Sequence, residues 1–577
     1  MEAEKKLTGY PSIDKPWLKY YTEEEINAPL PECTIFEYMY ENNKDYPNDI
    51  ALLYFNRKIT YGELFRNIDK TAKAFTKIGV KKGDIVTIAM PSMPEALYCV
   101  YALNRLGAVA NMIHPLASEN EICHYLNEVK STVFVMFTGT YELIKNALDK
   151  TGVKKAVVAS PAESLSAPVR FLYNLKNKEP KFGTDSVFQS WNNFIKAGKG
   201  VTVNYESHDP NKMAVISHTG GTTGEPKGVM CSDKNLNALM VQLVCNFKYQ
   251  RQGKSLVVLP PFVNYSLIDA MTAMLAIGYQ VILLPKYEPE KIAEYIGKYH
   301  PTIVLSIPAY WKVLLNLSEK DNTDFSSLEQ IYYGGESMDE ETENRINAVL
   351  RAHGSAFDLC KGFGATEMSA AATQSYPDCN PIGSVGIPLV QVNCKIIDTE
   401  TGAELTYNQE GEIAFSGPTL MLGYYNKPEA TDEIVKVHGD GNRWLHTGDL
   451  GYITEDGIIY VTGRIKRIIM TKGNDGQVTK MFPDRIEKAV LEHPAVSLCC
   501  VIGVADEKRI HYPKAVIVLN SGYEKSDVTT AEILALCKEK LPDYMVPEII
   551  EYRDDLPRTS RGKVDYRALE QEAENKE

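Results

Sequence analysis

Short apolar runs alternate with helical patterns along most of the chain. The run Ile85-Val-Thr-Ile-Ala is followed by a helical pattern that begins at Pro94. Similar apolar runs begin at Thr132, Lys155, Ser255, Val281 and Thr302. Strands that alternate with helices predict an α/β protein whose sheets are mainly parallel.

The pattern changes near Gln391, where short β-rich segments separated by turn residues replace this alternation. Asp456-Gly457 stands between two such segments and predicts a hairpin. A compact α+β unit then runs from about Lys466 to the end. We predict a large domain over residues 1–465, made of parallel-rich α/β subdomains and a small β-barrel-like part, and a small domain over residues 466–577. The Ser, Pro and Lys residues within segment 162–181 predict that this segment is an excursion on the surface.

Composition narrows the class of protein. The 577 residues are 44% hydrophobic and 24% charged, which is typical of a globular protein with two or more domains. No apolar run approaches the ~18 residues that span a bilayer, and no export signal is evident. We therefore expect a cytoplasmic protein without a transmembrane segment. Contact with a membrane surface remains an open alternative. The net charge of −13 argues against binding nucleic acid. The 11 cysteines show no metal-ligand spacing and are expected to be reduced and mostly buried.

The first chemical signal is a Gly/Thr-rich segment after the apolar strand that begins at Met213. Residues 217–228 read SHTGGTTGEPKG. Glycines let backbone N–H groups approach an anion, and the Thr hydroxyls and a Lys add donors and charge. It is not a Walker A loop, because Pro226 precedes Lys227. We predict a phosphate-binding loop rather than a flexible turn, with contacts from Thr219, Gly220, Gly221, Thr222, Thr223, Gly224 and Lys227.

This segment resembles the phosphate loop of the adenylate-forming superfamily, which includes acyl-CoA synthetases, firefly luciferases and nonribosomal-peptide adenylation domains. Other motifs similar to those of the family follow in order over nearly the whole chain, at residues 334–336, 362–367, 447–450, 463–466 and 556–564. The resemblance implies a ligase that uses ATP and Mg²⁺ to convert a carboxylic acid to an acyl-adenylate, releases pyrophosphate, and passes the acyl group to CoA.

The resemblance also implies roles for single residues around the nucleotide. Gly335 and Glu336 would contact it, and Phe363, next to Gly364, would stack on adenine. Thr366 would bond the α-phosphate. Glu367 would hold Mg²⁺, which selects hard oxygen ligands such as carboxylates. Without the resemblance, Thr366 and Glu367 would be interpreted as a helix cap and a solvated acid.

The C-terminal motifs carry further implied roles. Asp449 would accept both ribose hydroxyls, because one carboxylate has two oxygens, and Arg464 would meet the nucleotide. Lys563 would stabilise the charge that develops when the acid attacks the α-phosphorus. Lys466 would be the hinge about which a mobile C-terminal domain rotates between adenylation and thiol transfer.

Two segments depart from the family pattern. The loop after Lys472 is longer than usual in the family. Either Gly473 or Gly476 matches the family glycine on the thiol side. Because this loop faces the thiol in relatives, a phosphopantetheinyl acyl carrier protein remains an alternative acceptor to CoA. The acid-pocket segment has Val263, Asn264 and Tyr265 and offers no carboxylate to pair with a substrate ammonium.

An uncharged tail is therefore favoured for the acid. Similarity to fatty-acyl ligases favours a medium or long chain, and an aryl acid is the alternative. Trp311 is expected in the core rather than in the pocket wall. A luciferase-like oxygenase would share the fold, and a catalytically dead nucleotide sensor is disfavoured because the catalytic residues are present.

Overall fold

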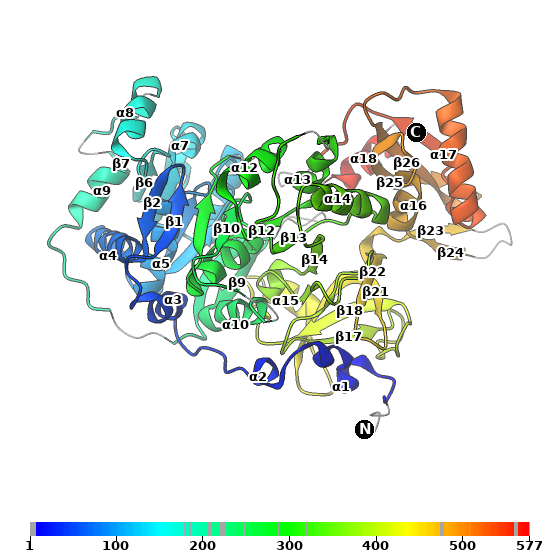
Figure 1. The fold of residues 1–577 in the computed structure, drawn as a ribbon, viewed down its shortest axis with the longest axis horizontal. Coiled ribbons are helices and arrows are strands. Elements are labelled where there is room, and N and C mark those ends of the chain that lie inside the picture. Colours follow the sequence, from blue (N-terminus) through cyan, green and yellow to red (C-terminus); the bar gives the residue numbers. More distant parts are fainter. Residues whose placement is uncertain are drawn as a thin grey trace.

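The computed structural model describes residues 7–177, 180–183, 186–205, 209–219, 226–245, 249–286, 288–318, 321–472, 478–506, 508–558 and 564–575. Two mostly parallel sheets form the large N-terminal part of the molecule (Figure 1). A β-rich part and a small C-terminal lobe follow. No helix within these ranges has an apolar stretch long enough to cross a membrane.

The first sheet has eight strands in the order β19-β9-β8-β4-β3-β5-β6-β7. Its parallel strands are β3 (Ile85–Ala89), β4 (Val109–Met112), β5 (Val133–Phe137), β6 (Lys155–Ala159), β7 (Phe188–Ser190) and β8 (Met213–His218). Two antiparallel strands complete one edge, β9 (Gly228–Ser232) and β19 (Gly423–Tyr424). The sheet brings residues near 230 and 424 together.

The second sheet has nine strands in the order β16-β15-β14-β13-β12-β10-β11-β1-β2. Its parallel strands are β1 (Ile50–Tyr54), β10 (Lys254–Val257), β11 (Gln280–Leu283), β12 (Ile303–Ser306), β13 (Gln330–Tyr333) and β14 (Cys360–Phe363). The antiparallel strands are β2 (Arg57–Thr60), β15 (Thr373–Gln374) and β16 (Ile387–Pro388). The predicted parallel α/β class is confirmed.

Helices of the large part bury apolar faces against these sheets. Helix α5 (Pro94–Arg105) is buried along nearly its whole length, which marks a helix inside the core. Helix α4 (Tyr61–Lys77) packs against it, and its N-cap is Thr60, whose hydroxyl accepts a hydrogen bond from the Glu63 amide. Trp311 on α13 (Pro308–Lys312) is fully buried and donates to the Tyr332 carbonyl at 3.0 Å, which confirms its core position.

Five antiparallel strands form the β-rich part: β17 (Asn393–Ile397), β18 (Gly411–Ser416), β20 (Val435–Val437), β21 (Arg443–Ile453) and β22 (Ile459–Arg464). The β21–β22 hairpin turns through Gly457, whose φ of 85° suits glycine, so the predicted hairpin is confirmed. Because β17 and β20 are not paired with each other in the described chain, the sheet is open rather than closed into a barrel.

The C-terminal lobe has its own core and the expected α+β composition (Figure 1). Its strands are β23 (Ile469–Lys472), β24 (Val478–Met481), β25 (Val496–Asp506), β26 (Ile510–Leu519) and β27 (Ile549–Tyr552). Its helices are α16 (Pro483–Leu491), α17 (Asp527–Lys540) and α18 (Tyr566–Glu574).

The predicted surface excursion contains a helix, α8 (Ala167–Lys176), that sequence reasoning missed. None of its residues is buried, and Phe171, Leu172 and Leu175 are exposed. Ala162 and Leu165, which precede it, are buried, so the surface part of this segment begins only at α8.

Candidate active site

Three of the candidate nucleotide motifs follow the carboxyl ends of parallel strands in the two large sheets, whereas Asp449 and Arg464 lie on the antiparallel strands β21 and β22. The loop from Thr219 to Lys227 follows β8, Gly335 and Glu336 follow β13, and the segment that begins at Gly364 follows β14. β13 and β14 are neighbours. Open α/β sheets bind ligands outside the carboxyl ends of their strands, so this edge is the candidate active site.

The base of the predicted phosphate loop is closed by two hydrogen bonds. The Thr219 amide donates to the Lys227 carbonyl at 2.9 Å, and the Lys227 amide donates to Thr219 Oγ1 at 3.2 Å. The residues between them that were predicted to bind phosphate, Gly220, Gly221, Thr222, Thr223 and Gly224, lie outside the described residues. The loop therefore starts and ends on paired backbone at the mouth of the β8–β9 hairpin.

Glu367 and Lys227 are linked by a tyrosine that sequence reasoning missed. The Tyr424 hydroxyl donates to Glu367 Oε1 at 2.5 Å, and Lys227 Nζ lies 4.9 Å from the centroid of the Tyr424 ring. Burial and the adjacent Glu367 carboxylate hold the pKa of Tyr424 well above its usual value, so its hydroxyl stays protonated and donates. No local pattern marks Tyr424, because its strand β19 is only two residues long.

Thr366 and Glu367 lie on a short 3₁₀ turn, η6 (Thr366–Met368), that follows β14. The Ser369 amide donates to the Thr366 carbonyl, and the Met421 amide donates to the Glu367 carbonyl at 2.8 Å. Phe363 is half-buried, with its ring centroid 6.1 Å from that of Phe415. The backbone that presents the predicted phosphate and metal contacts is thus held on both sides.

At two positions of the site, Gly335 and Gly364, the backbone explains why the residue is glycine. Gly335 has φ of 80°, the left-handed conformation that side chains disfavour, and Glu336 beside it is exposed. At Gly364 a Cβ atom would lie 1.9 Å from the Ala370 carbonyl oxygen. Only glycine fits at Gly364 without moving the following turn.

We expect Gly364→Ala to lower the free energy of unfolding by about 1–3 kcal/mol because the added methyl overlaps backbone. Gly297→Ala in α12 (Ile292–Tyr299), where a Cβ meets nothing within 4 Å, is the matched control and should melt at or above the parent temperature. Thermal melts of both variants check this. A parent-like melting temperature for Gly364→Ala would contradict the packing argument.

Asp449 and Arg464 face each other across the β21–β22 hairpin. Arg464 Nε lies 2.7 Å from Asp449 Oδ1, and the Asp449 amide donates to Thr447 Oγ1 at 3.0 Å. Asp449 is 6% exposed, whereas the Arg464 side chain is 52% exposed. The carboxylate is therefore fixed in orientation beside a cation that solvent reaches.

The three predicted acid-pocket residues stand where a loop enters the π-helix η3 (Tyr265–Thr272), an element that often marks functional sites. Asn264 is buried, and its Oδ1 accepts a hydrogen bond from Ser217 Oγ on β8 at 2.5 Å. Val263 and Tyr265 are partly buried. Asn264 thus ties this segment to the strand that leads into the phosphate loop.

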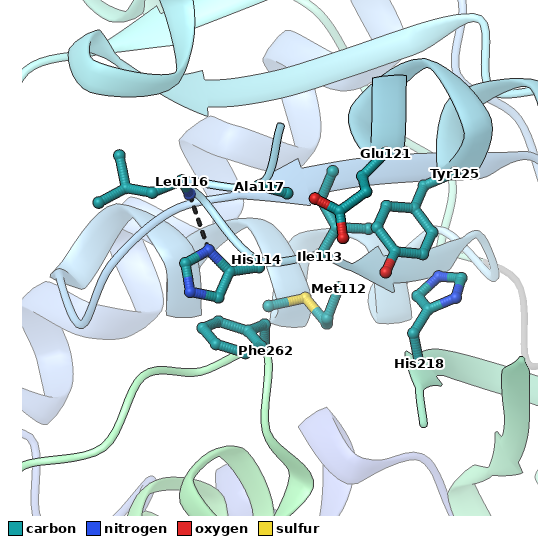
Figure 2. Close-up of a pocket in the computed structure, with 9 residues that line it drawn as sticks. All are labelled: Met112, Ile113, His114, Leu116, Ala117, Glu121, Tyr125, His218 and Phe262. Atoms are coloured by element: carbon teal, nitrogen blue, oxygen red, sulfur yellow. Dashed lines mark hydrogen bonds between the residues drawn. The ribbon is translucent and has the colours of Figure 1, made fainter. Parts of the chain in front are cut away.

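A pocket of about 120 Å³ lies beside the same strand (Figure 2). His114 packs on Phe262 with ring centroids 4.5 Å apart, and its Nδ1 accepts from the Leu116 amide at 2.9 Å. On the other side of the pocket, the ring centroids of Tyr125 and His218, the last residue of β8, are 4.3 Å apart. Sequence reasoning missed His114 and Tyr125; a histidine just after a buried strand was the available signal.

The predicted hinge residue Lys466 is exposed and lies on the 3₁₀ turn η7 (Ile465–Arg467). Arg464 before it pairs with Asp449 of the large part. Arg467 after it pairs at 2.6 Å with both Asp484 and Glu487 of α16 in the C-terminal lobe. The predicted residues Gly473, Gly476 and Lys563 lie outside the described part of the chain.

Comparison with known proteins places these features in a family. The family model described as AMP-binding enzyme matches residues 39–425, and the model for the AMP-binding enzyme C-terminal domain matches residues 485–563. A long-chain-fatty-acid–CoA ligase of Bacillus subtilis (strain 168) is 30% identical over 97% of this chain and 99% of that relative. One from Escherichia coli O157:H7 is 28% identical over 90% of this chain and 92% of its own length. The fold is like that of the anthranilate CoA ligase AuaEII in complex with anthranoyl-AMP, with TM-score 0.82 and 22% identity over 95% of this chain and 99% of that one.

Proposed function

Because the chain belongs to the AMP-binding enzyme family, we propose that it activates a medium- or long-chain fatty acid with ATP and transfers the acyl group to CoA. It is an AMP-forming acid–thiol ligase. The observation that best supports this function is the convergence of Thr366, Glu367, Tyr424 and Lys227 at the carboxyl edge of the sheets.

In the adenylation step the acid's carboxylate attacks the α-phosphorus of ATP, and pyrophosphate leaves. Thr366 offers a hydroxyl to the α-phosphate, and Lys563 brings a positive charge to the same group. The Glu367 carboxylate, oriented by Tyr424, suits Mg²⁺, which would neutralise phosphate charge when bound. Lys227 adds a fixed cation at the end of the phosphate loop.

Asp449 and Arg464 are assigned to the ribose and phosphate side of the nucleotide. The buried carboxylate can accept from two hydroxyls, and Arg464 is exposed enough to turn toward ligand. Phe363, Gly335 and Glu336 complete the nucleotide surface. We place the domain boundary at residues 465 and 466, between two arginines whose side chains form ion pairs in opposite domains.

The identity of the acid and the identity of the thiol acceptor are the more specific parts of this proposal. A fatty acid is favoured because the pocket segment has Val263 rather than a carboxylate, and because the curated relatives are named for long-chain fatty acids. The alternatives are an aryl acid, and a phosphopantetheinyl carrier protein in place of CoA.

A pyrophosphate-release assay over a panel of fatty and aryl acids tests the proposal. Each acid is assayed with CoA, with a phosphopantetheinyl carrier, and with neither. We expect the highest turnover with medium or long fatty acids, and thioester formation only when CoA is present. If thioester forms only on the carrier, the carrier rather than CoA is the acceptor. If no acid supports pyrophosphate release, the proposed function is wrong.

Glu367→Gln is expected to raise the Mg²⁺ concentration for half-maximal adenylation by about tenfold or more and to lower the rate, because an amide oxygen carries no net charge. Tyr424→Phe keeps the carboxylate and loses only the hydrogen bond that orients it, so its shift should be smaller. Magnesium titrations of pyrophosphate release, with thermal melts as the folding control, compare the two. An unchanged titration for Glu367→Gln would rule out the metal role.

A further inference from the structure

A small cavity of about 30 Å³ lies between the helix that follows the acid-pocket segment and the second sheet. Tyr265, at the start of η3, and Gly362, on β14 directly before Phe363, both line it. Most of its other walls are apolar, formed among others by Leu243, Met274, Leu305 and Ala371. The cavity therefore adjoins both the acid-pocket segment and the strand that carries the nucleotide residues.

Several polar side chains also line the cavity, and two of them, Asp269 and Gln374, carry the argument. Asp269 is 1% exposed and Gln374 is 4% exposed. Within the described part of the chain, neither Asp269 Oδ1 nor Gln374 Oε1 has a hydrogen-bond partner. A buried polar atom left unpaired destabilises the folded protein, so two such atoms at one cavity indicate a polar group that fills it.

The protonation of Asp269 indicates what kind of group fits. Desolvation by burial raises the pKa of Asp269 well above its usual value. A neutral carboxylic acid both donates and accepts hydrogen bonds, as a hydroxyl does, whereas a substrate ammonium would need an ionised partner. A terminal methyl group would leave both oxygens unpaired.

We propose that this cavity receives a hydroxyl group on the tail of the acid, held by Asp269 and Gln374. This inference rests on the proposed function, since it names a feature of the acid that the ligase activates. Asp269 is then a specificity-determining residue, which selects hydroxylated acids over their deoxy counterparts.

The position of the cavity limits where the hydroxyl stands. Gly362 is four residues before Thr366, so their Cα atoms are at most about 14 Å apart. The volume has room for roughly two water-sized groups, which is enough for a hydroxyl and its carbon and too little for a whole tail. Both a hydroxylated aryl acid and a hydroxylated medium-length alkyl acid meet these limits.

Paired probe acids test the proposal. The kcat/KM of pyrophosphate release is measured for 4-hydroxycinnamic against cinnamic acid and for 10-hydroxydecanoic against decanoic acid. The parent enzyme should prefer the hydroxylated member of at least one pair by about tenfold or more. The pair that shows the preference identifies an aryl or an alkyl tail.

Asp269→Leu should abolish this preference while melting at or above the parent temperature, because it removes a buried, unpaired polar group. Asp269→Asn keeps hydrogen-bonding capacity and should keep part of the preference. Glu95→Gln is the matched control: Glu95 is also a buried carboxyl with an unpaired oxygen, but it lies on α5 outside the cavity, and the preference should be unchanged.

Equal kcat/KM for both members of each pair in the parent enzyme, or a preference that survives Asp269→Leu, would show that the cavity holds only water. Thermal shifts with each acid alone separate this failure from failure of the proposed function. If no acid releases pyrophosphate but a hydroxylated acid stabilises the parent and not Asp269→Leu, the cavity assignment stands and the ligase function falls.

Discussion

Lys563→Ala is expected to slow acyl-adenylate formation by about 10²–10³-fold while ATP still binds. The Lys563 charge should act on the phosphate oxygens as pyrophosphate leaves, so its loss raises the transition state more than the bound ground state. Single-turnover pyrophosphate release measures the adenylation step directly. Equilibrium binding of ATP should change little.

Two controls make this result specific. Lys563→Ala supplied with preformed acyl-adenylate and CoA should form thioester at close to the parent rate, because that half-reaction does not need the lysine. Lys538→Ala removes an exposed cation from α17 of the same lobe and should leave both half-reactions intact. Parent-like pyrophosphate release by Lys563→Ala would remove this residue from the adenylation step.

Much of the fold could be predicted because buried parallel strands have nearly continuous apolar sequences. The run that begins at Ile85 coincides with β3, and the run at Thr302 lies within a residue of β12. Helix α8 was missed because the Ser, Pro and Lys residues of segment 162–181 indicated a loop, although the helix itself is rich in apolar residues, several of which are exposed. The open shape of the β-rich sheet depends on pairing between distant strands, which spacing does not reveal.

Candidate site residues could be proposed from contiguous motifs, whereas their long-range contacts could not be predicted from the sequence. Glu367 was proposed as a metal ligand from its motif, but its hydrogen-bond partner Tyr424 comes from a two-residue strand that pairs with β9, far away in the sequence. Asp269 had a signal that was overlooked: a single carboxylate inside the apolar run from Leu267 to Ala276. An acid in such a run must be paired, neutral or functional.

The second large effect is expected at the hinge. Lys466 stands between Arg464, which pairs with Asp449 of the large domain, and Arg467, which pairs with Asp484 and Glu487 of the small one. A rotation between domains that keeps these ion pairs must change the backbone within these few residues. Lys466→Pro would prevent that change, because proline fixes φ near −65°, a value that a 3₁₀ turn already adopts.

We therefore expect Lys466→Pro to keep the half-reaction that this backbone conformation permits and to lose most of the other, with acyl-adenylate formation largely retained and transfer to the thiol reduced by about tenfold or more. Quenched-flow measurement of each half-reaction tests this. Lys466→Ala removes the same side chain without fixing the backbone, so it should support both steps, and a thermal melt near the parent temperature establishes that the proline variant is folded. If both half-reactions of the folded proline variant fall equally, or if transfer is untouched, the pivot is not at Lys466, and the ion pairs of Arg464 and Arg467 must break and reform during the cycle instead.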